Sequence, residues 1–296
     1  CFMLLGVRGN WAFVLPFRAT KLLGLVLVAY SIAVSTVLFQ TVTNNRILTP
    51  AIMGFDTLFI LIQTVVIFFF TSRALATVDP RLQFLLQVAV MVGFSLLLFR
   101  WLFAGGERSL HLLVLVGIVF GVFFRSVANL MQRMMDPNEF LVLQDSFFAS
   151  FNTIDRTLLG TSVVAVALAS LALWRLHRSL DVVSLGRATA IGLGVDYKAT
   201  VLKLLVIMAV LVSVSTALVG PVTCFGLLVV SLAHALAGDG RHRHILPASI
   251  LIAVICLVGG QTLMERVFSF GTALSIIIEF LGGLVFIGLI LRGAAR

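Results

Sequence analysis

The amino-acid sequence predicts an all-α, polytopic membrane protein in which residues 1–296 form a single transmembrane domain. Of the 296 residues, 60% are hydrophobic and only 11% are charged, and the mean hydropathy is +1.16. A soluble domain of this composition would not stay dispersed. Apolar runs of about 18 residues or more recur along the chain, and each can cross a hydrocarbon layer of ~30 Å. The runs are continuous rather than alternating, which favours helices over the strands of a β-barrel.

Nine apolar segments follow one another along the chain. Cys1–Val7, ahead of Arg8, has the composition of the tail of another span whose beginning is missing, so we expect ten transmembrane helices in the intact protein. The nine predicted spans are residues 22–40, 55–71, 82–99, 110–130, 157–174, 200–219, 222–237, 247–263 and 273–291.

The connections between the spans predict an orientation. If Arg175–Lys203 and the C-terminus are cytoplasmic, twelve of the 21 Lys and Arg residues fall on the cytoplasmic side and nine on the other, a weak bias in the expected direction. On the opposite side Pro137 follows Asp136, which is a typical helix start. We therefore expect a short amphipathic external helix within Met134–Thr157.

The segment Arg175–Lys203 is the most polar part of the chain. It holds five Lys or Arg residues, so it does not lie in hydrocarbon, and it is far longer than a turn requires. A polar helical excursion between two spans is a place where a soluble partner can act on a membrane protein. We interpret residues 175–203 as a cytoplasmic coupling region.

No catalytic constellation is present in the sequence. The chain lacks G-x-x-x-x-G-K-[ST], so it has no P-loop of its own, and we expect neither enzymatic activity nor a bound cofactor. His234 and His242-Arg243-His244 have no carboxylate or Cys at ligand spacing, so we interpret them as part of a solvated loop rather than a metal site. The basic residues lie in connections between spans, as topology rules require, which argues against nucleic-acid binding.

Five short elements, in order over Arg18–Leu291, resemble those of the iron-siderophore and vitamin B12 ABC importer permeases. The elements are Gln40 with Asn44–Gly54 ("Q…NPLA.P..LG"), Ala190–Val195 ("A..LGv"), Gly220 with Phe225–Leu227 ("G.igF.GL"), Gly238–Pro247 ("G.dhr.llP") and Leu281–Phe286 ("lG.P.F").

Three positions depart from the family pattern. Val230-Ser231 stands in place of Pro-His, Leu284 in place of Pro, and Asn45-Arg46 in place of Asn-Pro. These changes resemble the branch that serves ferric catechol siderophores of the vibriobactin, enterobactin or anguibactin type, in which two different permeases usually pair.

The resemblance implies a type II ABC importer permease in a bacterial inner membrane. Such a chain would carry a ferric siderophore from periplasm to cytoplasm by alternating access. Its implied partners are a cytoplasmic ABC ATPase dimer that binds ATP and Mg²⁺, a second permease subunit (in a heterodimer or a homodimer), and a periplasmic siderophore-binding protein.

The resemblance also assigns two contact sites. Arg18, Lys21 and Arg266 match or lie near family arginines that receive carboxylates of the binding protein, although Lys21 lacks the guanidinium fork. Interfacial anchoring is the alternative for these cations. Contact with the ATPase is assigned to Leu185, Gly186, Ala190, Leu193, Gly194 and Val195.

Polar residues within or near the spans are candidates for the translocation path. Gln40, Gln63 and Glu279 should face the bundle or the path, because polar groups in a membrane seldom face lipid. Glu279 lies just before Gly282-Gly283, and a protonated or helix-capping acid at a helix break is an equal alternative. Helix packing is the alternative for the glutamines.

Two other functional classes stay open. A secondary transporter would need its own ion-coupling site and would leave Arg175–Lys203 without a role. An ATPase-driven permease for free zinc or manganese would show inward-facing His or Asp near the midplane. Within the family, haem and vitamin B12 are further alternatives to a siderophore.

Overall fold

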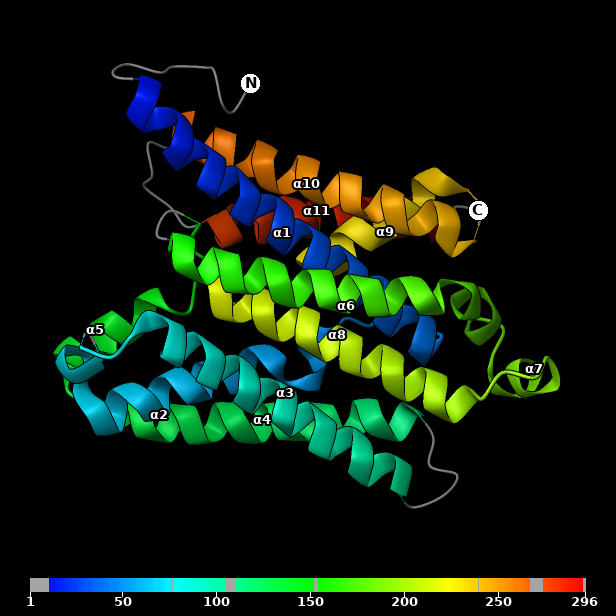
Figure 1. Ribbon diagram of the computed structural model, residues 1–296, viewed down its shortest axis with the longest axis horizontal. Coiled ribbons are helices and arrows are strands. Elements are labelled where there is room, and N and C mark those ends of the chain that lie inside the picture. Colours follow the sequence, from blue (N-terminus) through cyan, green and yellow to red (C-terminus); the bar gives the residue numbers. More distant parts are fainter. Residues whose placement is uncertain are drawn as a thin grey trace.

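The computed structural model describes residues 11–75, 77–104, 110–151, 154–238, 240–266 and 274–294, and the described segments form a bundle of helices (Figure 1). The helices are α1 (Trp11–Thr43), η1 (Pro50–Met53), α2 (Phe55–Leu75), α3 (Pro80–Ala104), α4 (Leu110–Arg133), α5 (Pro137–Asp145), α6 (Arg156–Val183), α7 (Arg187–Gly192), α8 (Tyr197–Val219), α9 (Phe225–Ala237), α10 (His242–Arg266) and α11 (Leu274–Ala294).

Every one of the nine predicted spans falls on a helix of the structure, which confirms the all-α fold. Six helices, α1, α3, α4, α6, α8 and α10, are long and apolar enough to cross a membrane, while the apolar parts of α2, α9 and α11 are shorter. The predicted helix formed partly by Cys1–Val7 lies outside the described residues.

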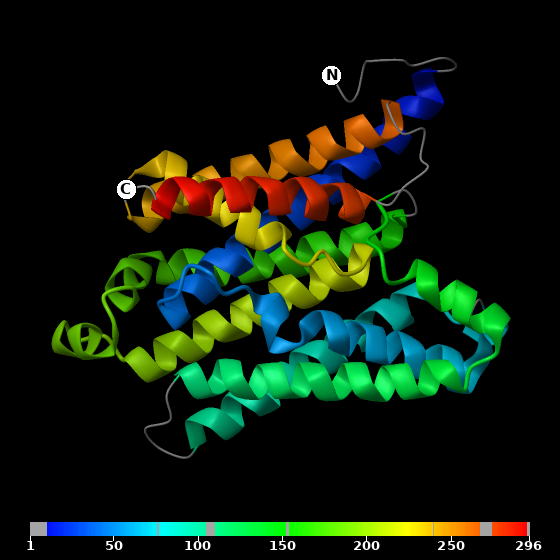
Figure 2. The same ribbon diagram turned by 180° about the vertical axis from the view of Figure 1, so that it is seen from behind.

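The centre of the bundle is formed by α1 and α8, which cross and pack against each other (Figures 1 and 2). In the most apolar stretch of each, 72% of the residues are buried, against 28–33% in α3, α4, α6 and α10. The outer helices therefore present a broad apolar surface, as a bundle surrounded by lipid requires.

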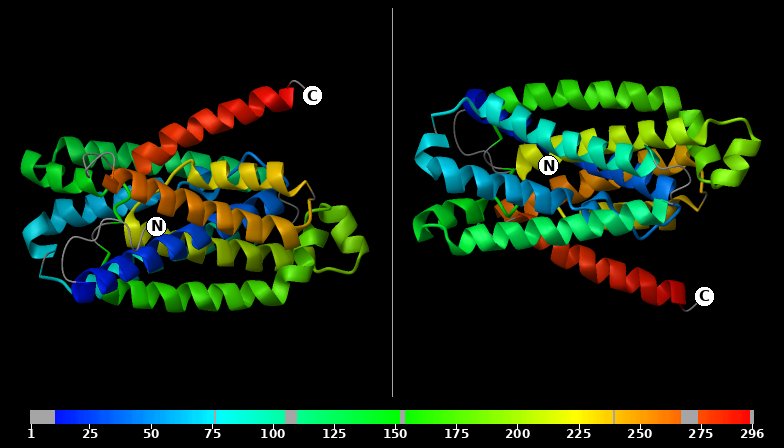
Figure 3. Two further views of the ribbon diagram at one scale, coloured as in Figure 1. Left: turned by 90° about the horizontal axis from the view of Figure 1, so that it is seen from above. Right: turned by 90° about the horizontal axis from the view of Figure 1, so that it is seen from below.

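The two short polar helices lie at opposite ends of the bundle (Figures 1 and 3). The predicted external helix is α5, and Asp136 caps it by accepting a hydrogen bond from the backbone N–H of Asn138. At the other end, α6 continues to Val183, nine residues beyond the predicted span. The first nine residues of the predicted coupling region 175–203 thus continue α6, and α7 with the turns on either side of it joins α6 to α8.

Two helices begin inside the membrane layer rather than at its surface. The turn between η1 and α2 packs against Gly117 and Gly121 of α4, and Gly226 at the start of α9 packs against Ile32 and Thr36 of α1. With a rise of about 1.5 Å per residue, both contacts lie about 10–16 Å from the ends of α4 and α1 on the α7 side of the bundle. The predicted span 222–237 is thus a helix of only 13 residues, α9, preceded by a non-helical segment that ends in a turn.

The close approach of η1 to α4 depends on a glycine, which gives a first prediction. A Cβ on Gly117 would lie 2.9 Å from Cα of Met53, and backbone cannot move aside as a flexible side chain can. We expect Gly117→Ala to lower the free energy of unfolding by about 1–3 kcal/mol. Thermal unfolding in mild detergent measures the effect.

The matched control is Gly93→Ala in the interior of α3, where the added methyl group meets nothing within 4 Å. This control should be neutral or stabilising by up to about 1 kcal/mol, because alanine is the better helix former. Equal unfolding temperatures for the two variants would contradict the tight contact at Gly117.

Candidate functional site

The segment that joins α6 to α8 projects from the end of the bundle (Figure 1). It turns at Gly186 (φ +90°) and again at Gly194 (φ +80°), conformations that side chains with a Cβ rarely adopt. Asp196 then starts α8 by accepting a hydrogen bond from the backbone N–H of Ala199. These turns hold α7 away from the helical body, with open space around both glycines.

The projecting segment presents an apolar surface outside the membrane spans. Leu185, Ile191 and Leu193 are 59%, 54% and 60% exposed. Ala190 is fully buried and serves the packing of the segment itself, and Val195 is half-buried. Exposed leucines on a polar excursion are typical of a surface that a partner covers.

A hydrogen-bonded cluster fixes the base of this segment to two other helices. Near the end of α6, the Asp181 carboxylate accepts from the backbone N–H of His242 (3.0 Å) and lies 2.6 Å from its Nδ1. The other ring nitrogen of His242 lies 2.6 Å from Thr41 Oγ1 in α1. The interpretation of His242 as a solvated loop residue is therefore wrong, because this side chain is 6% exposed and joins α1, α6 and α10.

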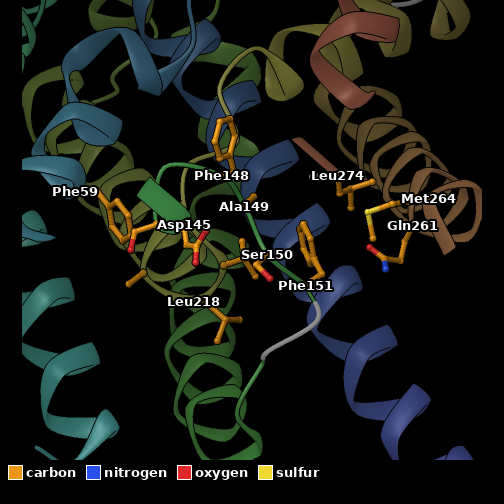
Figure 4. Close-up of a pocket in the computed structure, with 14 residues that line it drawn as sticks. Phe59, Asp145, Phe148, Ala149, Ser150, Phe151, Leu218, Gln261, Met264 and Leu274 are labelled. Carbon is orange, nitrogen blue, oxygen red and sulfur yellow. The ribbon is translucent and has the colours of Figure 1, made fainter. Parts of the chain in front are cut away.

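Among the described residues, no group of three or more His, Cys, Asp or Glu side chains is placed to hold a metal ion. The cavity of the bundle that could hold a ligand lies at the other end. There a cavity of about 520 Å³ is lined by the α5–α6 connection, the end of α8, and α2, α10 and α11 (Figure 4). Its volume is in the range of ligand pockets.

The wall of this cavity is both aromatic and polar. Phe59 from α2 stands on one side and Gln261 and Met264 from α10 on the other, with Phe148 and Phe151 from the α5–α6 connection between them (Figure 4). The connection is held in place by a hydrogen bond from the Ser150 N–H to the Val219 carbonyl (2.8 Å), at the end of α8. The geometry therefore forms a preorganised recess at the end opposite α7.

The cations assigned to docking lie at the same end as this cavity, but they differ in environment. Lys21 is 6% exposed, and its ammonium pairs with Glu265 of α10 at 2.5 Å. The same carboxylate accepts a hydrogen bond from Gln261 (2.9 Å). Lys21 thus joins α1 to α10, whereas Arg18 is half-buried and the Arg266 side chain lies outside the described residues.

The residues assigned to the path are not brought together. Gln40 is buried near the end of α1 and donates to the Arg46 carbonyl (2.7 Å), so it closes the turn that follows α1. Gln63 donates to Gln87 across α2 and α3 (3.3 Å), at a groove of about 240 Å³. Glu279 belongs to α11, and its side chain lies outside the described residues.

Sequence reasoning did not identify Asp56, which lies in a buried polar region in the middle of the bundle. The starts of α2 and α9 approach α1 and α8 around a void of about 30 Å³. Asp56 in the first turn of α2 lines this void and is 8% exposed. Thr49-Pro50 and Gly220-Pro221 were the available signal, because an interrupted apolar segment marks a broken helix. Hydroxyl groups complete the lining, from Ser35, Thr36, Ser215 and Thr216.

Comparison with known proteins shows which family the chain resembles. The family model of the FecCD transport family matches residues 4–292. The chain is 47% identical over 284 residues to the petrobactin import system permease protein YclO of Bacillus subtilis, covering 96% of this chain and 90% of that protein. It is 37% identical over 278 residues to the petrobactin import system permease protein FatC of Bacillus anthracis, covering 94% and 78%.

A solved structure of a metal-chelate type ABC transporter, in an inward-facing conformation, has the same fold. Its TM-score is 0.86 at 21% sequence identity, over 98% of this chain and 93% of that chain. At this identity the likeness concerns the fold alone, and it confirms the type II importer architecture.

The Lys21–Glu265 pair gives a second prediction. Each side chain is largely buried (7% and 14% exposed), so removing one charge strands the other in a poorly solvated site. We expect Lys21→Met or Glu265→Gln alone to destabilise the protein by roughly 3–5 kcal/mol. The measurement is thermal unfolding in detergent.

The double variant Lys21→Met with Glu265→Gln removes both charges and should recover most of the loss, because no buried charge is left unpaired. Additive effects of the two single changes would mean that the two residues do not interact. Lys21 would then again be a candidate for contact with the binding protein.

Proposed function

Because the chain belongs to the FecCD transport family, we propose that it is the permease subunit of an ATP-driven importer that carries a ferric siderophore across the bacterial cell membrane into the cytoplasm. The observation that carries the proposal is the 47% identity, over nearly the whole chain, to a petrobactin import permease. In this proposal ATP is hydrolysed by a separate partner chain. Catechol-type chelates such as ferric petrobactin are the proposed substrates.

The projecting segment around α7 is the proposed contact with the ATPase. Its exposed leucines match the family element for ATPase contact, and its base is tied to α1 and α10 through Asp181 and His242. A displacement imposed on α7 would therefore reach three membrane helices at once. Rigid elements joined in this way can convert the closure of a soluble partner into alternating access.

The recess at the opposite end is the proposed entry for the chelate. The ring of Phe148, which is 42% exposed, can pack against the catechol rings of a siderophore, and serine and glutamine side chains can accept or donate hydrogen bonds. In this proposal a binding protein would deliver the chelate to this end, with Arg18 and Arg266 as the cations that receive its carboxylates. In this proposal Lys21 holds α1 to α10 instead of receiving a carboxylate of the binding protein, because it is buried and paired with Glu265.

Reconstituted uptake tests the proposal against its alternatives. The permease, its cognate ATPase and the binding protein are placed in liposomes, and internalised iron is measured with ferric petrobactin outside. We expect uptake that requires ATP inside and the binding protein outside. Uptake driven by an ion gradient without ATP would indicate a secondary transporter. Uptake of free zinc or manganese, but not of the chelate, would indicate a metal-ion permease.

Coupling through α7 gives a third prediction. Leu193→Asp places a charge on the proposed contact, so it should lower uptake by about tenfold or more, the loss expected when a hot-spot side chain is removed. The basal ATPase rate of the complex should persist, since the ATP site lies on another chain. Uptake and phosphate release are measured on the same liposomes.

Leu236→Asp is the matched control, because Leu236 is 71% exposed at the same end of the bundle but lies on α9 outside the projecting segment. It should transport like the wild type. If Leu193→Asp also transports normally, α7 is a connection and not a coupling element.

A further inference from the structure

Helix α4 carries an arginine on its outer surface at a depth where lipid would be expected. Arg125 is exposed in the described structure, and none of the described residues pairs with its guanidinium. Within α4 it lies fifteen residues after Leu110 and eight before Arg133. At about 1.5 Å per residue, this places Arg125 about 22 Å from one end of the helix and about 12 Å from the other.

The direction of α4 makes it difficult for Arg125 to reach the nearer surface. Side chains of a helix tilt toward its N-terminus, and the N-terminus of α4 lies at the α7 end of the bundle (Figures 1 and 2). The Cα–Cβ bond of Arg125 therefore points away from the external surface, which is the nearer one. A long basic side chain escapes lipid by extending to the interface, and this geometry opposes that escape.

Further polar residues extend from Arg125 to the external end of α4. Asn129 and Arg133 follow at intervals of four residues, and both are exposed. Residues spaced by four lie on one side of a helix, so the three form a polar ladder. Exposed apolar residues, including Phe123 (56% exposed) and Leu130 (61%), occupy the other flank of the same outer surface.

The ladder lies on the flank of α4 that faces α2. Gln132, which lies seven residues after Arg125 and therefore close to it around the helix axis, donates to Thr64 of α2 (3.1 Å). The opposite flank packs on α3, where Phe94 contacts Phe120 and Phe124 with ring centroids 5.3 and 5.0 Å apart. Figure 2 shows α4 and α2 on the same side of the bundle as α11. This side also bears the recess lined by Phe59 and Leu274.

We propose that the ladder Arg125–Asn129–Arg133 lines the water-filled translocation path and that Arg125 is a binding site for the anionic ferric chelate in transit. The inference rests on the proposed function and adds to it the residue that would recognise the charge of the substrate. A ferric ion held by catecholates carries net negative charge, which complements a guanidinium. Ionisable residues within membranes generally face such paths.

Thiol labelling tests whether water reaches the ladder. In a variant whose native cysteines are replaced by alanine, Arg125→Cys and Phe123→Cys place a thiol at the same depth on opposite flanks of α4. We expect a membrane-impermeant, positively charged methanethiosulfonate added outside to label Arg125→Cys but not Phe123→Cys. Added ferric petrobactin should slow the labelling. No label at residue 125, or equal labelling at both positions, would overturn the proposal.

Uptake tests whether the charge matters. Arg125→Gln should lower ferric petrobactin uptake by about tenfold, as expected for the loss of one charge-assisted hydrogen bond. Arg125→Lys should retain most of the activity because it keeps the charge. Arg100→Gln, which removes an exposed arginine from α3, is the control and should transport normally.

The remaining outcomes separate this inference from the proposed function. Wild-type uptake by Arg125→Gln would overturn the role of Arg125 and leave the importer assignment intact. Loss of the second permease during copurification of Arg125→Gln would show that Arg125 binds a carboxylate of that subunit, which also overturns the proposal. Failure of the wild type to import the chelate would contradict the proposed function itself. Labelling of Arg125→Cys but not of Phe123→Cys would still show, in that case, that water reaches the ladder.

Discussion

The absence of water in the hydrocarbon layer is the constraint on which the rest of this structure depends. Each helix satisfies its own backbone hydrogen bonds, so a helix that begins inside the membrane must bury its free N–H groups in protein. The structure meets this requirement for α2 and α9 by packing their starts against α1, α4 and α8. Glycines at the contacts with α4 and α1 let the backbones approach, and the hydroxyl groups of α1 and α8 surround the small void between the two starts.

The same constraint explains which polar side chains join the helices. Gln63 with Gln87, Gln132 with Thr64, and Lys21 with Glu265 each connect two helices within the bundle. In lipid such contacts add specificity to packing that is otherwise driven by shape. Arg125 differs from these residues because it is exposed on the outer surface, and none of the described residues pairs with its guanidinium.

Sequence reasoning was accurate where the signal is local and failed where partners are far apart. Long apolar runs specify helices, and Asp136-Pro137 specifies the start of α5, because length and capping act within a few residues. The buried positions of Lys21 and His242 depend on Glu265 and Asp181, which are 244 and 61 residues away. Arg125 lies inside the predicted span 110–130, and this position could have identified it as a functional residue. The charge count treated it as a loop residue instead. The depth at which α2 and α9 begin cannot be predicted from the sequence either, since an apolar run has the same composition whether its first turn lies at the membrane surface or inside the membrane.

The polar contacts of α1 and α10 limit how this bundle can move. These antiparallel helices are joined at one end by Thr41 and His242 and at the other by Lys21 and Glu265. Sliding one helix along the other would break both contacts and leave a buried charge unpaired at Lys21 or Glu265, which is costly. Movement of the pair as one body breaks neither contact. Because Asp181 ties α6 and the α7 segment to the same pair, a displacement of the α7 segment acts on α1, α6 and α10 together.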